Sequence, residues 1–156
     1  VRPLVLIEWF MFLDEHYLSG VINHASDCWI ATWGVAVIGF ASALAYPSGT
    51  VKNARREHRL VVLPDFQGLG MGVRISDAVA ASYTKMGCRY FSKTANHRLG
   101  EYREHSPLWK PTSKNRRSRA DYKIDPSRPQ KEDKYKMNHS NRVCYSHEFI
   151  GESTNA

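Results

Sequence analysis

The chain has 156 residues and a hydrophobic fraction of 42%, values that suit one folded domain and exclude an intrinsically disordered chain. The formal net charge is +7, and residues 110–142 alone carry eleven Lys or Arg against four Asp or Glu, so the rest of the chain is close to neutral. No apolar run reaches the roughly 20 residues of a membrane-spanning helix, and the amino-terminal stretch lacks a signal-peptide pattern, so we expect a cytoplasmic protein without a membrane partner.

The first half of the chain is dominated by β-prone runs. In chain order it predicts a strand, one or two helices and three further strands, at residues 4–7, 9–26, 28–33, 35–46 and 55–63. Gly34 separates two of these strands, so we expect an antiparallel hairpin there. The last of them is heavily charged from Arg55 to Arg59, which indicates a strand that borders a polar cleft.

The second half predicts a helix, a strand, a short helix and a closing strand, at residues 73–86, 88–94, 96–105 and 142–150. Ile75, Val79 and Tyr83 step by four along the first helix, and Gly87 suits the position after its last turn. Residues 106–141 are rich in Lys, Arg, Ser, Asn, Pro and Asp. We therefore expect a partly ordered excursion within a single domain that comprises residues 1–156.

The most distinctive stretch is residues 61–74, where a β-branched run ends at Pro64 and Gly68, Gly70 and Gly72 precede the helical pattern. This order places unpaired backbone N–H groups at the positive end of a helix, and glycines let a phosphate approach the main chain. We therefore predict a pyrophosphate site. A nucleoside-triphosphate loop would need Lys-Ser or Lys-Thr at the helix start. A dinucleotide loop would need glycine at position 73 and an earlier place in the chain, so both alternatives fail.

The stretch Gln67-Gly68-Leu69-Gly70-Met71-Gly72 resembles the Q/R-x-x-G-x-G/A motif of the GNAT acyltransferases, and residues 62–66 resemble its V-x-P-x-[YF] lead-in. The order of elements over residues 4–105, with 142–150 as a closing strand, is also similar to that family. The resemblance implies an α/β fold with a mixed, mostly antiparallel central sheet, flanking helices and splayed central strands. It implies an N-acetyltransferase that moves an acetyl group from acetyl-CoA to a primary amine by direct attack on the thioester.

In this family the glycine turn holds the pyrophosphate of acetyl-CoA, and the edge of the preceding strand pairs with the pantetheine arm. The resemblance therefore implies that acetyl-CoA contacts the following residues: Leu60, Val61, Val62, Gln67, Gly68, Leu69, Gly70, Met71, Gly72, Val73, Arg74 and Asn96.

The same resemblance suggests two catalytic groups. An amine must lose a proton before it attacks, and Glu57 matches the base on the strand before the turn, with His58 as the alternative. Tyr102 matches the acid that protonates the leaving thiolate, although Asn96 stands one residue closer to it than the family pattern has. Without a catalytic role, Glu57 would pair with a neighbouring arginine and Tyr102 would pack beneath the cofactor.

The basic residues 110–142, with interleaved Trp109, Tyr122 and Tyr135, are typical of a surface that binds nucleic acid or another polyanion. A solvated loop and contacts with the 3′-phosphate of CoA are alternative interpretations. The alternative function is accordingly a nucleic-acid-associated module or an RNA acetyltransferase.

The sequence also bears on thiols, metals and assembly. Cys28, Cys88 and Cys144 are far apart, which favours buried free thiols. The histidines do not form a spaced ligand set, so we expect no metal. Exposed sheet edges are compatible with a monomer or a homodimer, and the pattern does not identify the amine acceptor.

Overall fold

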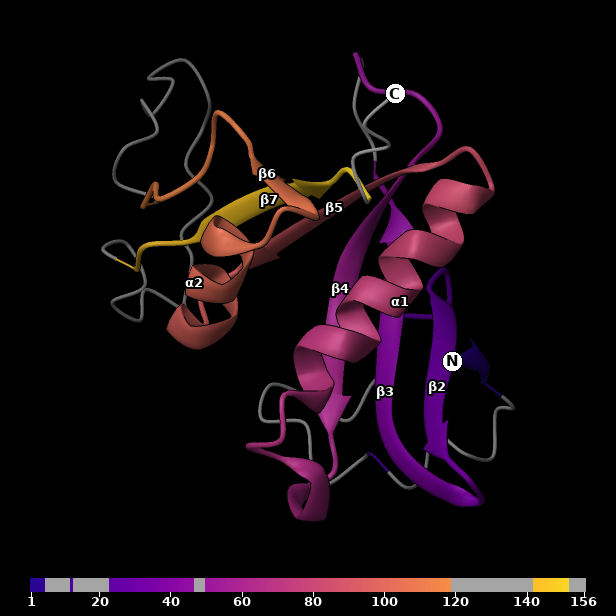
Figure 1. The fold of residues 1–156 in the computed structure, drawn as a ribbon. Coiled ribbons are helices and arrows are strands. Elements are labelled where there is room, and N and C mark those ends of the chain that lie inside the picture. Colours follow the sequence, from indigo (N-terminus) through magenta and orange to yellow (C-terminus); the bar gives the residue numbers. More distant parts are fainter. Residues whose placement is uncertain (5–11, 13–22, 47–49, 119–141, 152–156) are drawn as a thin grey trace, which may run out of the picture.

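The computed structural model describes residues 1–4, 12, 23–46, 50–118 and 142–151 (Figure 1). Its elements are β1 (Arg2–Pro3), β2 (Asp27–Trp33), β3 (Ala36–Ala45), β4 (Ala54–Val62), the 3-10 turn η2 (Pro64–Phe66), α1 (Met71–Lys85), β5 (Arg89–Thr94), α2 (His97–His105), β6 (Trp109–Pro111) and β7 (Tyr145–Phe149). The strand predicted at 4–7 and the helices predicted at 9–26 fall largely outside the described residues.

The strands form one seven-stranded sheet in the order β1-β2-β3-β4-β5-β7-β6. Every neighbouring pair is antiparallel except β4 with β5, which run parallel. That parallel pairing covers only three residue pairs and ends at Arg56 and Phe91. Beyond this point the two strands separate (Figure 1), which confirms the predicted mixed sheet with splayed central strands.

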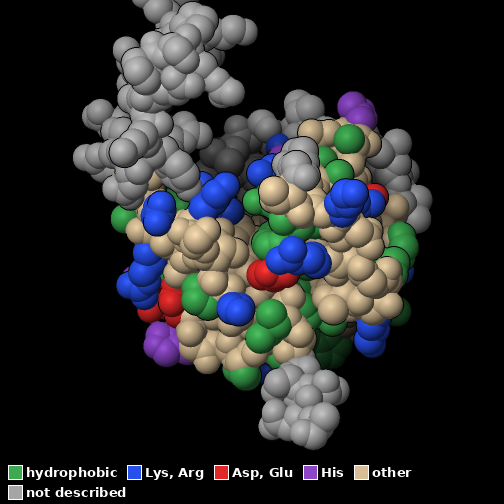
Figure 2. Space-filling view, turned by 90° about the horizontal axis from the view of Figure 1, so that it is seen from above, with side chains coloured by type: hydrophobic (Ala, Val, Ile, Leu, Met, Phe, Trp, Pro, Cys, Tyr) green, Lys and Arg blue, Asp and Glu red, His purple; other side chains and the backbone are tan. Residues whose placement is uncertain are grey.

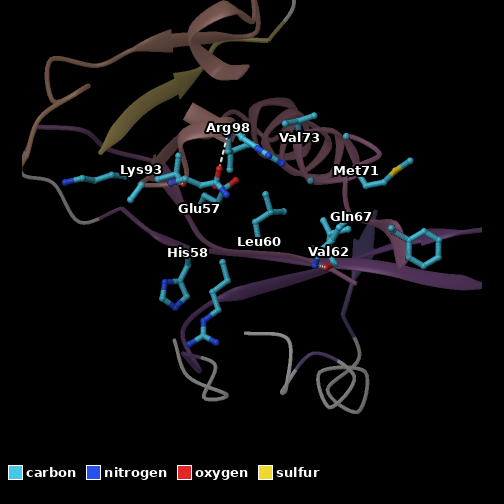
Figure 3. Close-up of a pocket in the computed structure, with 18 of the residues that line it drawn as sticks. Glu57, His58, Leu60, Val62, Gln67, Met71, Val73, Lys93 and Arg98 are labelled. Atoms are coloured by element: carbon cyan, nitrogen blue, oxygen red, sulfur yellow. Dashed lines mark hydrogen bonds between the residues drawn. The ribbon is translucent and has the colours of Figure 1, made fainter. Parts of the chain in front are cut away.

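One extra residue in β4 changes which way its side chains point. Ser42 of β3 pairs with Arg59 and the next residue, Ala43, pairs with Glu57, so His58 has no partner in β3. Such a bulge shifts the alternation of a strand by one residue. As a result Glu57 and Leu60 point toward α1, whereas His58 points to the opposite side of β4 (Figure 3).

Two apolar clusters lie on the two faces of the sheet. The larger cluster lies on the face that α1 covers, and Ile75, Val79 and Tyr83 of α1 pack there with the aromatic residues of β5 and β7. The smaller cluster, on the other face, contains Phe12, Ile30, Phe40 and Val61. The period-four pattern that predicted α1 is therefore the buried stripe of this helix.

The first part of the basic excursion is ordered. Trp109 to Pro111 form β6, which pairs with β7, and Arg117 bridges to Cys144 further on. Trp109 is only 4% exposed, so it cannot belong to the polyanion surface that the sequence suggested. Tyr122 and Tyr135 lie outside the described residues.

The three cysteines are free, as predicted, but each is only half-buried. None of the described helices is long and apolar enough to cross a membrane.

Candidate active site

A cleft of about 840 Å³ opens where β4 and β5 separate (Figure 3). Its walls come from the second half of β4, the glycine turn, the first turn of α1, and the segment that joins β5 to α2. The described chain has no strand beside the second half of β4 on its β5 side, so the main-chain groups of that edge face the cleft.

Most of the residues predicted to bind acetyl-CoA line this cleft, namely Leu60, Val62, Gln67, Gly68, Gly70, Met71, Gly72, Val73 and Asn96. Three others do not contribute to its lining. Val61 packs into the cluster on the opposite face of the sheet, and Leu69 is 61% exposed on the outside of the turn. Arg74 also lies outside the lining residues.

The turn has the geometry of an anion site. Gly70 adopts φ +73° as the residue before α1, and no side chain caps the helix at this position. A Cβ at Gly70 would meet no atom within 4 Å, so the space above the turn is open. The uncapped first-turn N–H groups, at the positive end of the helix dipole, therefore face a space that a phosphate could enter.

Gln67 fixes this turn to the end of β4. Its side-chain Nε2 donates a hydrogen bond of 2.9 Å to the carbonyl oxygen of Val62. The side chain that precedes the glycines thus holds the turn and the strand edge together as one wall of the cleft.

Glu57 reaches the cleft wall, but its carboxylate already has partners. Arg103 of α2 donates from Nη2 to both carboxylate oxygens at 3.0 Å. Ser76 of α1 donates to Oε2 at 2.6 Å and Ser92 of β5 donates to Oε1 at 3.0 Å. Glu57 therefore pairs with an arginine, as we expected if it had no catalytic role. The partner is Arg103, however, and not an arginine near it in sequence.

His58 lines the same cleft from the other side of β4 and is exposed to solvent. Partial desolvation lowers the pKa of its imidazole below the usual 6.5, and the charges of Arg59 and Arg56 lower it further. The ring is therefore neutral at pH 7 and able to accept a proton.

Tyr102 does not reach the cleft. Its hydroxyl donates a hydrogen bond of 2.6 Å to Asp77 of α1, and its ring lines a separate hollow beside Leu108. Partial burial and the contact with Asp77 raise the pKa of this phenol. Glu57 and Tyr102, which we expected to converge on a thioester, are thus not brought together.

Asn96 has a role that the sequence did not assign. Its side chain accepts a hydrogen bond of 3.1 Å from the N–H of Leu99 and so caps the first turn of α2, at the rim of the cleft.

Sequence reasoning missed Lys93 and Arg98, two basic side chains of the far wall, which is the wall that β5 and the start of α2 provide. Lys93, Arg98 and Arg142 line the cleft together with Arg59. The alternation along the strand at residues 88–94 could have indicated Lys93, because it places Lys93 on the opposite face from Ser92 and Thr94. The described residues contain no group of three His, Cys, Asp or Glu side chains that could hold a metal ion.

Solved structures of acetyltransferases share this fold. The ribosomal-protein-S18-alanine N-acetyltransferase from Escherichia coli matches with a TM-score of 0.63 at 12% identity, over 97% of this chain and 96% of that chain. The spermidine/spermine N-acetyltransferase from Vibrio cholerae, solved with manganese ions, matches with 0.62 at 11% identity, over 95% and 89%. An acetyltransferase from Bacillus subtilis, solved in complex with CoA, matches with 0.52 at 13% identity, over 92% and 82%. A comparison of the sequence with curated proteins finds no match.

The sheet order, the splayed strands and the glycine turn together define an acetyltransferase fold. The profile of the acetyltransferase (GNAT) family matches residues 4–103. The chain therefore belongs to the GNAT acetyltransferases, which are acetyl-CoA-dependent enzymes, and the resemblance of residues 67–72 is confirmed.

Proposed function

We propose that the protein transfers the acetyl group of acetyl-CoA to a primary amine by direct attack of the amine on the thioester. The observation that carries this proposal is the meeting of two features in one cleft. An uncapped helix start at Gly70 faces the same space as the edge of β4 at Leu60 and Val62, beside which the described chain has no strand.

These features fit the two ends of the donor. The pyrophosphate of acetyl-CoA would lie on the N–H groups that follow Gly70, and the pantetheine arm would pair with the main chain of residues 60–62. Lys93, Arg98 and Arg142 on the far wall give the cleft a positive charge, which suits a donor that carries several phosphate charges.

His58 is the base in this proposal, in place of Glu57. The carboxylate of Glu57 accepts hydrogen bonds from Arg103, Ser76 and Ser92, and these contacts hold it away from a substrate proton. The imidazole of His58 is neutral at pH 7 and lies on the side of β4 away from α1. An amine that approaches from that side would meet both the thioester and the imidazole.

The leaving group needs no side-chain acid in this scheme. The hydroxyl of Tyr102 is bonded to Asp77 outside the cleft. A thiol has an ordinary pKa near 8.5, so the thiolate of CoA leaves at neutral pH and takes its proton from water.

The acceptor class rests on similar proteins. The Escherichia coli and Vibrio cholerae structures are those of an alanine N-acetyltransferase and a spermidine/spermine N-acetyltransferase, both of which acetylate amines. No described feature favours the nucleic-acid alternative. Trp109 is buried, Arg116 pairs with Glu101 and Glu104, and the Lys and Arg side chains on the face in Figure 2 are scattered rather than gathered in one stripe.

The test is a thiol-release assay with acetyl-CoA and a panel of amines that includes a polyamine and a peptide with a free amino-terminal alanine. We expect at least one amine to accelerate the release of CoA thiol, with an acetylated product of the right mass. Release of thiol that no amine accelerates would contradict the proposal.

A further inference from the structure

The ion pair between Glu57 and Arg103 is buried at the fork of the sheet. The Glu57 side chain is 8% exposed and the Arg103 side chain is 1% exposed. The last residue pair between β4 and β5 is Arg56 with Phe91, so Glu57 is the first residue of β4 beyond the fork. A charged pair therefore occupies the position where backbone pairing between the two strands stops.

Five elements meet at this pair. Ser76 of α1 and Ser92 of β5 donate hydrogen bonds to the carboxylate of Glu57. The same two serines accept hydrogen bonds from the guanidinium of Arg103. The ring of Trp109 in β6 covers the guanidinium, with 4.4 Å between Arg103 Cζ and the ring centre. Directional contacts thus tie this carboxylate of β4 to β5, α1 and α2.

Stability alone does not account for such a pair. Taking two charges out of water is costly, and apolar residues of similar volume often stabilise a fold equally well. What a buried, hydrogen-bonded pair adds is fixed geometry, because its bonds hold only within narrow limits of distance and angle.

We propose that the Glu57–Arg103 pair is a positioning device that sets the opening between β4 and β5, and thereby the fit of the acetyl-CoA arm along β4. The pair acts through the two strands and does not touch the reacting atoms. This inference rests on the proposed function, since it takes the cleft to be the acetyl-CoA site.

The test compares a single with a double variant. Arg103→Met leaves the Glu57 carboxylate buried without its cation, and we expect the melting temperature to fall by about 10 °C. The double variant, Glu57→Gln with Arg103→Met, removes both charges and keeps the volume and a hydrogen-bonding group for the serines. Its melting temperature should return to within about 3 °C of the wild type.

Activity should not return with stability. We expect the double variant to keep a KM for acetyl-CoA at least about tenfold above that of the wild type, with a much smaller change in the KM for the amine. Arg103→Lys, which keeps the charge but has one nitrogen in place of the Nη1 and Nη2 that reach Ser92 and Glu57, should fold and show a raised KM for acetyl-CoA as well. The pH profile of kcat in Glu57→Gln should keep its acid limb, because Glu57 is not the base.

A folded double variant or a folded Arg103→Lys variant with the wild-type KM for acetyl-CoA would overturn the inference. Loss of the acid limb in Glu57→Gln would overturn it too, since Glu57 would then be the base. A wild-type protein that transfers no acetyl group at all would instead refute the proposed function, and binding of acetyl-CoA to the variants would still test the inference.

Discussion

At the scale of single residues, the bulge in β4 brings Glu57 and Leu60 to the same side of the strand. In a regular strand His58 and Glu57 would alternate and Leu60 would share the side of His58. The extra residue instead leaves Glu57 and Leu60 on the α1 side, while His58 points to the other side. A structural carboxylate and a titrating imidazole thus stand next to each other in sequence without competing.

The proposed role of His58 as the base makes a direct prediction. His58→Gln should lower kcat by a factor of about 10² to 10⁴, the usual contribution of a general base. In the wild type, kcat should fall on acidification below pH 6.5, because a base with a lowered pKa stays neutral until the pH drops beneath that value. The variant should lose this acid limb in a pH series measured at saturating substrates.

The matched control is His24→Gln, since His24 is exposed and does not line the cleft. We expect this variant to keep the wild-type kcat and its pH dependence. An unchanged acid limb in His58→Gln would assign the base to another group.

At the scale of the elements, α2 packs closely against β7 because residue 100 is a glycine and has no side chain. A Cβ on Gly100 would lie 2.2 Å from the ring of Tyr145, so only glycine allows this approach. Glycine inside a helix such as α2 normally lowers stability, and the contact with β7 supplies a reason for Gly100. Because Asn96 and Arg98 of the same segment line the cleft, this packing also places one wall of the site.

Gly100→Ala tests this packing, because the substitution should lower the free energy of unfolding although alanine favours helices more than glycine does. Helix propensity alone would stabilise the protein by up to about 1 kcal/mol, but the clash should destabilise it by about 1–3 kcal/mol. Denaturant unfolding measures the change. In a Tyr145→Leu background, which removes the ring, the same substitution should cost much less, and an equal cost in both backgrounds would show that the ring is not the cause.

Local sequence patterns predicted most of the described helices and strands. They could not predict contacts between residues that are far apart in the sequence. The glycine turn and α1 follow from residues that are adjacent or four apart, so their signals lie within one window of sequence. Arg103 and Glu57 are 46 residues apart in the sequence, and no pattern near either residue predicts that they pair. The strand β6 was missed because three residues that include Lys110 and Pro111 carry no strand period, and pairing with β7 alone makes them a strand.

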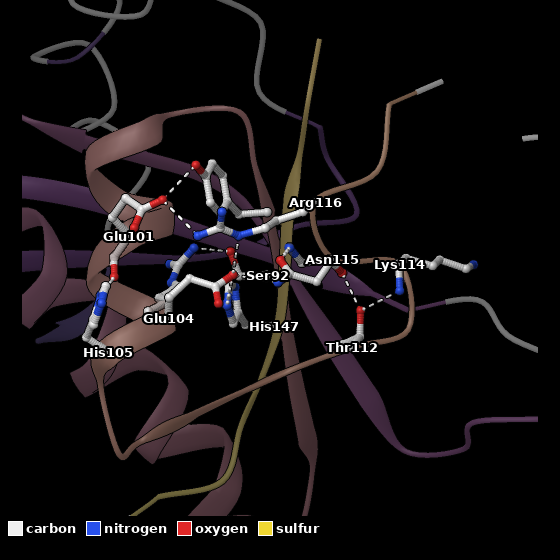
Figure 4. A network of polar contacts seen from close by, with 12 residues as sticks. Ser92, Glu101, Glu104, His105, Thr112, Lys114, Asn115, Arg116 and His147 are labelled. Carbon is white, nitrogen blue, oxygen red and sulfur yellow. Dashed lines mark hydrogen bonds and ion pairs between the residues drawn. The ribbon is translucent and has the colours of Figure 1, made fainter. Parts of the chain in front are cut away.

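At the scale of the whole molecule, a second polar network fastens the chain after β6 to α2 and β7 (Figure 4). Glu104 of α2 accepts hydrogen bonds from Asn115 and Arg116, and its Oε1 lies 3.4 Å from Nε2 of the fully buried His147. Desolvation lowers the pKa of His147. The charges of Arg103 and Arg116 lower this pKa further, whereas Glu104 raises it. The network therefore makes global stability depend on pH.

The sign of this dependence follows from the two states of His147. Below pH 6.5 the unfolded chain binds a proton that the folded chain does not, so the free energy of unfolding falls as the pH drops, by at most about 1.4 kcal/mol per pH unit for one proton. His147→Leu should lose less stability than the wild type between pH 7 and 5.5. Urea unfolding at each pH measures the difference, and parallel curves for the two proteins would contradict the assignment.

Glu104 adds a separate loss at lower pH. Its pKa is lowered, chiefly by the hydrogen bond from Asn115, so its contribution is present above pH 4.5 and is lost as the pH falls through the folded value.

Calorimetric titration with acetyl-CoA tests most directly whether acetyl-CoA lies in the cleft with its pyrophosphate on the turn at Gly70. Gly70 and Gly87 have nearly equal φ values, +73° and +74°, and a Cβ at either would meet no atom within 4 Å. Alanine at each position therefore costs a similar backbone strain of about 1–2 kcal/mol, but only Gly70 lines the cleft.

We predict one acetyl-CoA bound per chain, with an affinity at least about tenfold weaker in Gly70→Ala and unchanged in Gly87→Ala. Absence of binding to the wild type, or equal weakening by both substitutions, would contradict the account.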